Sequence, residues 1–353
     1  GLGMLSKIKG LRSLTLYTPR SEVIASLPAL DALESLFVWI EDVENPYVQK
    51  LPILYPTLKE FSCVLPITAD LSKLPKFPLL TELSVSAAEG FQPRDSAGFV
   101  GIPEFLEKHS SLERLSLQGV PESAVASIGG VNGLKSLSLV PAYAFDDAIW
   151  SNLAGLRNLE EVNIHMVTVG DTIASMLSAL PKLTNFFTMG TRSSLTEKGR
   201  KALASITSLK HMHIRTPVSD MRSHRLLEYF SGCTELETLV FSGYLTEADA
   251  SVISRSNVRY LEINSMAFDD SAMLKIAQCK NLSELALKYA YNLTEAGVTA
   301  LAGCPRLREL QLAYAPYVSA EAIARVLAAR KLRLLKLEHM AFDGSSIPPQ
   351  ARP

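Results

Sequence analysis

The sequence predicts an α/β solenoid, in which a strand and a helix alternate about fourteen times along the chain. Residues 282–306 show one unit of this pattern. Leu285 and Leu287 alternate with polar residues, which is typical of a strand with one buried face. After Thr294, the apolar residues recur at helical spacing. A strand and a helix within roughly 25 residues, repeated along the chain, indicate a solenoid.

Each unit opens at an equivalent apolar residue, followed by a strand pattern. The fourteen openings are Leu11, Leu33, Leu58, Leu80, Leu112, Leu134, Leu159, Leu183, Leu209, Leu236, Val258, Leu282, Leu307 and Leu332. Successive spacings are 22 to 27 residues, except for 32 residues between Leu80 and Leu112. Because this regularity leaves little room for a linker, we expect one solenoid domain over residues 1–343 and a C-terminal tail over 344–353.

Helix-start signals recur at a similar place in the later units. The residues in question are all good N-caps: Asp146, Thr196, Thr246, Asp269, Thr294 and Ser319. The acidic pairs Asp146/Asp147 and Asp269/Asp270 could also bind a cation, but their recurrence at the capping position favours helix caps. Before residue 110 the helical patterns are weaker and prolines interrupt them, so short 3₁₀ or extended segments are expected there.

A strand joined to the next parallel strand through a helix winds right-handed in nearly all proteins. We therefore expect a parallel β-sheet on the inner side of the solenoid and helices on its outer side. A small rotation per unit would bend the array into an arc or horseshoe.

The repeats resemble a known family. The segment L-S-E-L-A-L-K-Y-A-Y-N-L-T-E-A-G-V-T-A-L-A-G-C-P-R-L is similar to the cysteine-containing class of leucine-rich repeats. That class occurs in the recognition arms of F-box ubiquitin-ligase subunits and in related bacterial proteins. The resemblance implies a right-handed leucine-rich-repeat solenoid that recognises other proteins. This chain departs from the class in two ways. Where the class usually has Cys or Asn after the strand, this chain has apolar residues such as Ala290 and Ala315, and no F-box precedes Leu11.

The composition excludes several classes of protein. The 35 basic and 36 acidic residues nearly balance, so no overall charge points to nucleic acid or membrane. No apolar run approaches the roughly 18 residues of a membrane helix, and the start lacks the apolar core of a signal peptide.

Three of the four cysteines, Cys233, Cys279 and Cys304, fill a slot that is apolar in other units, so we expect buried thiols rather than zinc or disulfides. A cytoplasmic location is expected, with secretion as an effector as the alternative.

The sequence gives no indication of catalysis. It contains no G-x-S-x-G, G-x-x-x-x-G-K or H-E-x-x-H motif. We therefore predict a protein that is not an enzyme, with no catalytic residue, metal, cofactor or small-molecule substrate.

Three consecutive units carry distinctive residues at outward strand positions, which the core does not determine. They are Asn163, His165, Asn185, Phe187, Met189, His211, His213 and Arg215. Because adjacent strands lie about 4.8 Å apart, these side chains are predicted to form one patch that binds an acidic or aromatic segment of a partner. Residues 192–225 add eight Lys or Arg against two acids. The alternative is that several of these basic residues are merely solvated on the outer helix.

Two secondary candidates lie nearer the start. Phe37 and Trp39 occupy outward strand positions, where either an N-terminal cap outside this sequence or a partner is expected to cover them. The long connection of residues 87–103 contains Phe91 and Phe99 and is either a binding loop or a tolerated insertion.

The predicted function is that of a non-enzymatic scaffold that binds a protein partner through its inner sheet surface. The first alternative is a recognition subunit or effector that brings a target to a ubiquitin-ligase-like complex. The second is a binder of polyanions or nucleic acid through residues 192–225, which would make binding sensitive to salt.

Overall fold

The computed structural model describes residues 2–17, 21–88, 98–189, 192–215, 227–243, 245–329 and 332–342. The chain divides into two compact units. The first comprises Gly1–Val167 and Ala179–Lys182, and the second comprises Thr168–Ser178 and Leu183–Pro353. The predicted tail, 344–353, lies outside the described residues, and the prediction of a single domain over 1–343 stays a prediction.

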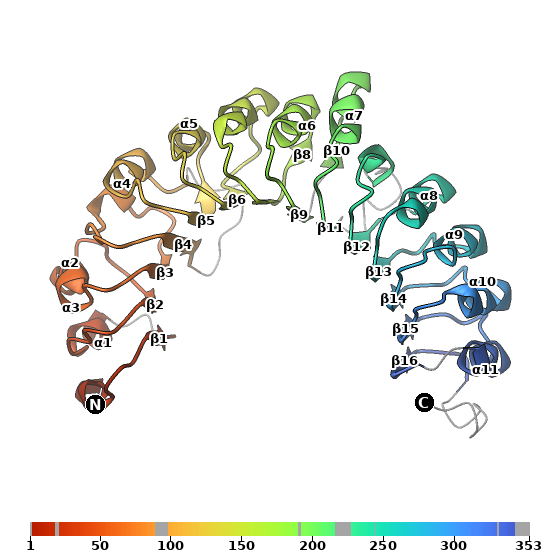
Figure 1. Cartoon of the computed structure of the whole chain (residues 1–353). Helices are drawn as coiled ribbons and strands as arrows, with labels where there is room; N and C mark the ends of the chain where they lie inside the picture. Colours follow the sequence, from red (N-terminus) through yellow and green to blue (C-terminus); the bar gives the residue numbers. More distant parts are fainter. Residues whose placement is uncertain are drawn as a thin grey trace. The chain divides into compact units, whose positions relative to one another are not determined.

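Parallel strands in sequence order form the sheet of the first unit (Figure 1). They are β1 (Ser13–Leu16), β2 (Ser35–Trp39), β3 (Glu60–Leu65), β4 (Glu82–Ala87), β5 (Arg114–Val120), β6 (Ser136–Pro141) and β7 (Glu161–Ile164). The register places equivalent residues of successive repeats side by side, so that Leu36 pairs with Phe61 and Leu115 with Leu137. These inward residues are buried and form the core of the unit.

Short helices alternate with these strands. They are η1 (Leu2–Lys7), α1 (Ser21–Ala25), α2 (Pro46–Gln49), α3 (Leu51–Leu54), η2 (Leu71–Lys73), α4 (Ile102–Lys108), η3 (Glu122–Ala124), α5 (Val125–Gly129) and η4 (Asp147–Gly155). Before residue 110 most of these segments are single helical turns or short 3₁₀ helices, as expected from the prolines that interrupt the helical patterns there. The helix predicted after Asp146 is also 3₁₀.

The second unit repeats the same plan. Its sheet contains β9 (Asn185–Met189), β11 (His211–Arg215), β12 (Thr238–Ser242), β13 (Tyr260–Asn264), β14 (Glu284–Lys288), β15 (Glu309–Ala313) and β16 (Leu334–Glu338), all parallel. Two short strands, β8 (Thr168–Val169) and β10 (Arg192–Ser193), pair with each other. Its helices are α6 (Asp171–Ser178), α7 (Glu197–Ala204), η6 (Leu227–Phe230), α8 (Glu247–Arg255), α9 (Asp270–Ile276), α10 (Glu295–Ala300), η7 (Leu301–Gly303) and α11 (Ala320–Ala329).

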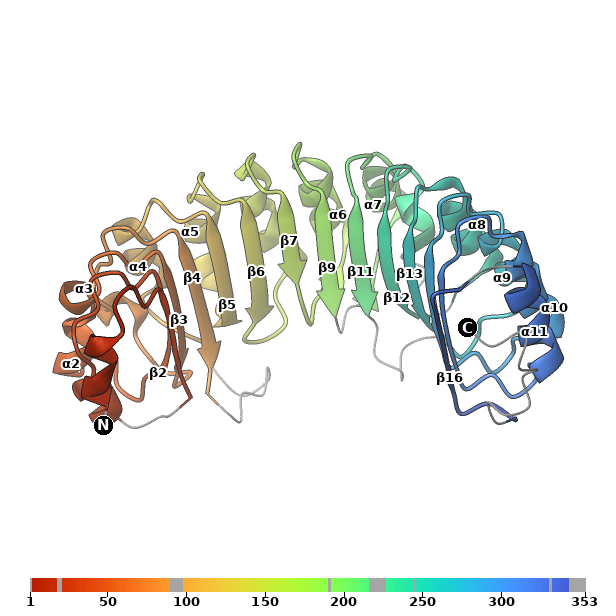
Figure 2. The same cartoon turned by 60° about the horizontal axis from the view of Figure 1, so that its bottom comes forward.

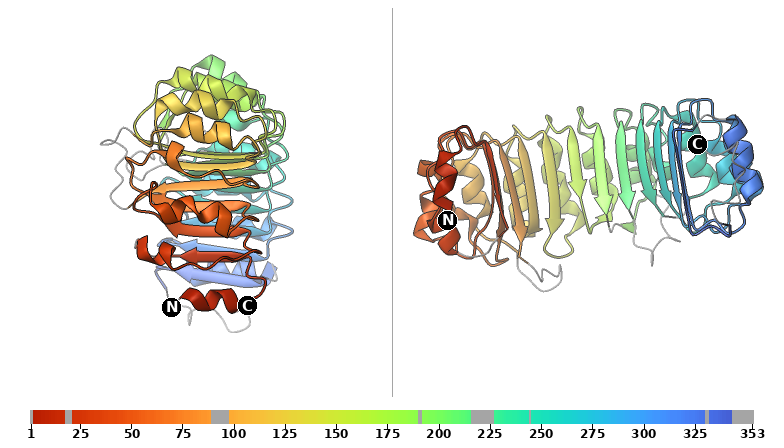
Figure 3. Two further views of the ribbon diagram at one scale, coloured as in Figure 1. Left: turned by 90° about the vertical axis from the view of Figure 1, so that its left-hand side faces the viewer. Right: turned by 90° about the horizontal axis from the view of Figure 1, so that it is seen from below.

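In each unit the helices lie on one side of the strands (Figures 1 and 2). None of the helices of the described residues lies on the other side, and Figure 3 looks onto that side in its right-hand view. We call this side of the strands in each unit its open face. Because side chains alternate along a strand, every second residue points to the open face and the others point into the core.

The predicted helix caps are confirmed. Thr196 accepts a hydrogen bond from the backbone N–H of Lys198, and Thr294 accepts one from Ala296. Asp146, Asp269 and Ser319 accept equivalent bonds, and Thr246 forms a reciprocal capping box with Asp249.

One carboxylate also links neighbouring helices in the second unit. Asp171, at the start of α6, accepts bonds from the backbone N–H groups of Thr196 (2.9 Å) and Gly199 (3.1 Å) at the start of α7. Asp270, at the start of α9, likewise accepts the N–H of Thr294 (2.9 Å) at the start of α10. The second aspartate of the pair Asp269/Asp270 therefore caps the helix of the next repeat.

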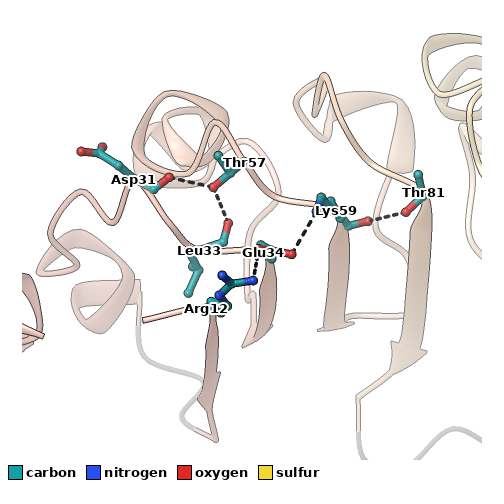
Figure 4. A network of polar contacts seen from close by, with 7 residues as sticks. All are labelled: Arg12, Asp31, Leu33, Glu34, Thr57, Lys59 and Thr81. Carbon is teal, nitrogen blue, oxygen red and sulfur yellow. Dashed lines mark hydrogen bonds and ion pairs between the residues drawn. The ribbon is translucent and has the colours of Figure 1, made fainter. Parts of the chain in front are cut away.

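The connections before the strands are joined by polar ladders (Figure 4). Glu34 pairs with both Arg12 and Lys59, each at 3.0 Å. Thr57, immediately before an opening leucine, donates to the carbonyl of Leu33, the opening leucine of the preceding repeat. Ser111 and Ser208 occupy the same position and make the same bond to the opening leucines Leu80 and Leu183. These bonds satisfy buried carbonyls and keep successive repeats in register.

The cysteines lie in the core, as predicted. Cys63, Cys233, Cys279 and Cys304 are all buried, and none of them forms a disulfide. The last three direct their Sγ atoms toward the backbone carbonyls of Ile206, Ile253 and Ala277 in the preceding repeat, at 3.2 to 3.6 Å. Burial raises the pKa of the Cys233 and Cys279 thiols to about 12, so they stay protonated at neutral pH.

Candidate functional site

The open face of the second unit presents three rows of side chains, one for each outward strand position. The row at the strand starts contains Asn185, His211, Thr238, Tyr260, Glu284, Glu309 and Leu334. The middle row contains Phe187, His213, Val240, Glu262, Ala286, Gln311 and Lys336, and the row at the strand ends contains Met189, Arg215, Ser242, Asn264, Lys288, Ala313 and Glu338. These residues differ from repeat to repeat, whereas the inward residues are nearly all apolar.

Strand β11 carries His211, His213 and Arg215 at its three outward positions. In register, the neighbouring strand β9 carries Asn185, Phe187 and Met189, and β12 carries Thr238, Val240 and Ser242. Neither neighbour therefore has a charged side chain on the open face. We call the three side chains of β11 the basic strip.

His213 lies at the centre of the basic strip. Its ring packs edge-on against Phe187, with ring centroids 4.5 Å apart and an interplanar angle of 84°. Partial burial lowers the pKa of His213 below its ordinary value, and the positive charge of Arg215 lowers it further. The carboxylate of Glu262 acts in the opposite direction but does not reverse the shift. The neutral imidazole is thus favoured in the free protein at neutral pH.

Glu262 is the centre of a network that the sequence did not reveal. Its side chain is only 12% exposed, and it accepts hydrogen bonds from Tyr260 (3.0 Å), Asn264 (3.0 Å) and Lys288 (3.1 Å). Burial alone would raise the pKa of Glu262, but the bonds from Asn264, Lys288 and Tyr260 outweigh it and hold the pKa below its ordinary value. The alternation of Y-L-E-I-N shows that Tyr260, Glu262 and Asn264 point outward from the same strand. It does not show that Tyr260 and Asn264 donate hydrogen bonds to Glu262.

The predicted patch divides between the two units. Asn185, Phe187, Met189, His211, His213 and Arg215 lie together on β9 and β11 of the second unit. Asn163 and His165 belong to the first unit. There, Asn163 donates to Glu161 at 2.9 Å, and burial lowers the pKa of His165. A single patch that includes both groups stays a prediction.

The secondary candidates have different surroundings. Phe37 and Trp39 are half-buried on the open face of the first unit, and Phe37 contacts the ring of Tyr17, which is 83% exposed. Phe99 is buried in the core of the first unit, so its side chain is not available to a partner in this structure. Phe91 lies outside the described residues.

The basic residues of 192–225 do not share one surface. Lys198, Arg200 and Lys201 lie on α7, on the helical side, where Lys201 pairs with Glu197 and Arg200 lies 5.0 Å from the Tyr229 ring centroid. Arg215 lies on the open face. Arg222 and Arg225 lie outside the described residues. This division does not favour a single polyanion surface.

The described ranges offer neither a metal centre nor a membrane-spanning helix. No group of three or more His, Cys, Asp or Glu side chains there is arranged to hold a metal ion. Within the same ranges, none of the helices combines the length and the apolar character needed to span a bilayer.

Neither the protein-family models nor the curated proteins include a match to this chain. Solved structures do match. An internalin from Listeria monocytogenes aligns with TM-score 0.46 and 16% identity over 91% of this chain and 78% of its own. The complex of Rad7 and Elc1 in yeast aligns with TM-score 0.49 and 16% identity over 99% and 81%. The TLR13–ssRNA13 complex aligns with TM-score 0.50 and 15% identity over 94% and 55%.

At these identities the likeness concerns the fold alone. The repeated parallel strands and the helices between them agree with the similarity to the TLR13 structure. The fold of this chain is an α/β leucine-rich-repeat solenoid.

Proposed function

We propose that this protein is a non-enzymatic scaffold that binds a protein partner through the open face of its second unit. The observation that carries the proposal is the basic strip, in which one strand presents two partly exposed histidines and the exposed Arg215 between two uncharged strands. Packing explains the inward residues, which are apolar in nearly every repeat, but it requires none of these three. A repeat scaffold offers such an extended surface because each unit adds one strand to it.

A narrower form of this proposal is a recognition subunit that brings the bound protein to a ubiquitin-ligase-like complex. Its support is the resemblance of the repeats to the cysteine-containing class of ligase subunits, whose cysteine slot is filled here by the buried Cys233, Cys279 and Cys304. Ligase subunits among the captured partners would favour this form over a simple scaffold.

The test is affinity capture from a lysate of the source organism with a charge-reversed bait. We expect His213→Glu/Arg215→Glu to lose the principal partner, because it replaces the basic strip with acids. The matched control is Lys198→Glu/Arg200→Glu, which makes a similar change of charge on α7, on the helical side. Retention of the same partners by both variants, measured by quantitative mass spectrometry, would place binding elsewhere and refute the proposal.

A further inference from the structure

On the described strands β9 and β12, which flank the basic strip, no acidic side chain faces the positive charge that Arg215 gives the strip. In register, His213 is followed by Val240 on β12 and then by Glu262 on β13. The nearest acid of the middle row is therefore two strands away, or about 9.6 Å at the usual strand spacing. That acid is already bonded to Tyr260, Asn264 and Lys288.

Arg215 is exposed, and none of the ion pairs within the described ranges involves it. Its guanidinium can form two parallel hydrogen bonds with a carboxylate without breaking an ion pair to any of the described residues. The strip thus provides charge complementarity for an anionic group from outside the chain.

An apolar shelf adjoins the strip. On β9, Phe187 is half-buried and Met189 is 51% exposed, and each pairs in register with a member of the strip. On the other side of His213, Val240 points outward but is only 3% exposed, and it lies in register between His213 and Glu262. An extended peptide along the strip can therefore place carboxylates on β11 and an apolar side chain on β9.

We propose that the partner segment is an acidic peptide carrying an apolar side chain, and that His213 takes up a proton when this segment binds. This inference rests on the proposed function and deepens it by assigning the chemistry of the partner. The segment lies along β11, with its carboxylates beside Arg215 and His213 and its apolar side chain against Phe187 and Met189.

The charges around His213 explain the coupling to protons. Its own strand contributes His211 and Arg215, and Glu262 faces it from β13; the outward residues of β9 and β12 are uncharged. In the free protein, burial holds the pKa of His213 below its ordinary value. A bound carboxylate raises this pKa, so the complex holds more protons than the free protein. Affinity therefore increases as pH falls from the bound pKa to the free pKa.

A random dodecapeptide library displayed on phage, selected on the full chain at pH 6.0, tests the inference. We expect enrichment of peptides with several Asp or Glu residues and one aromatic or aliphatic residue. Synthetic copies are then titrated at pH 5.5 and 7.5 against the wild type, His213→Gln and Arg215→Gln. The matched control is the triple substitution of Lys198, Arg200 and Lys201 to Gln on α7.

A rise of one unit in the pKa of His213 corresponds to about tenfold in affinity, so binding should be about three to ten times tighter at pH 5.5. His213→Gln should remove this dependence, and Arg215→Gln should weaken binding at both pH values; the α7 control should do neither. Because the Arg215 side chain is exposed, its replacement tests the site without threatening the fold.

Three outcomes would contradict the inference in different ways. Acidic peptides that bind equally at both pH values refute the proton uptake. Neutral or basic peptides that still require Arg215 refute the acidic partner but leave the proposed function intact. Selected peptides that no open-face substitution affects refute both.

Discussion

At the scale of single residues, two glycines show how closely neighbouring helices approach in the second unit. Gly199 and Gly297 occupy the same place in L-T-E-x-G, near the starts of α7 and α10. A Cβ atom at Gly199 would collide with Oδ1 of Asp171, and one at Gly297 would collide with Oδ1 of Asp270. The glycines are therefore needed for the carboxylate of one repeat to cap the helix of the next.

Gly199→Ala should consequently destabilise the second unit. The added methyl group must displace Asp171, which also weakens the bonds to Thr196 and Gly199, so a loss of about 1–3 kcal/mol in the free energy of unfolding is expected. Urea denaturation followed by circular dichroism measures it. The matched control is Gly303→Ala, where the nearest atom is 4.0 Å from the new Cβ. Equal stabilities of the two variants would contradict the proposed clash.

At the scale of elements, an aromatic stack joins the ends of three strands. Tyr289, Tyr314 and His339 each follow a strand directly, after β14, β15 and β16. The rings of Tyr289 and Tyr314 stack with centroids 5.3 Å apart, and those of Tyr314 and His339 with centroids 4.4 Å apart. All three residues have positive φ, between 52° and 61°, which non-glycine residues rarely adopt. Ring stacking between repeats offsets the cost of this backbone conformation.

Two substitutions of Tyr314 separate the contribution of ring stacking from the cost of the positive φ. Tyr314→Ala removes both stacking contacts and keeps a strained backbone, so it should cost about 1–3 kcal/mol. Tyr314→Gly removes the same contacts but accepts φ of +56° freely, and should be about 1 kcal/mol more stable than the alanine variant. Chemical denaturation of both proteins provides the comparison. A glycine variant no more stable than the alanine variant would show that the backbone is not strained there.

The elements differ in how far the sequence predicts them. Inward strand residues and caps such as Thr294 could be predicted, because they follow from the period of the chain and from local backbone bonding. The reach of Asp270 to the next helix could not, because it depends on the offset between two repeats. Phe99 was named as a secondary binding candidate in the long connection of residues 87–103, yet the fold buries its side chain. The open-face residues could be named, but the network around Glu262 required the register of β13 and β14.

At the scale of the whole molecule, the repeat organisation makes stability local. In each unit the strand of one repeat pairs with the strands before and after it, and caps such as Asp171 reach only the next repeat. In such arrays, stability is approximately a sum of repeat and nearest-neighbour contributions. The open face can therefore vary in one repeat without disturbing distant ones, which suits the partner-binding role proposed above.

This locality predicts the result of a core substitution. Leu285, on β14, is buried among equivalent leucines, and Leu285→Ala should cost about 2–5 kcal/mol by leaving a cavity. Hydrogen exchange measured by mass spectrometry should show lost protection in β13, β14 and β15 and in α9 and α10, with β2 to β5 unchanged. The matched control is Leu115→Ala, on β5 of the first unit. It should reduce protection around β5 and leave the protection of β13 to β15 unchanged. If either substitution instead reduced protection evenly over both units, the chain would unfold as one cooperative body, and the nearest-neighbour account would be wrong.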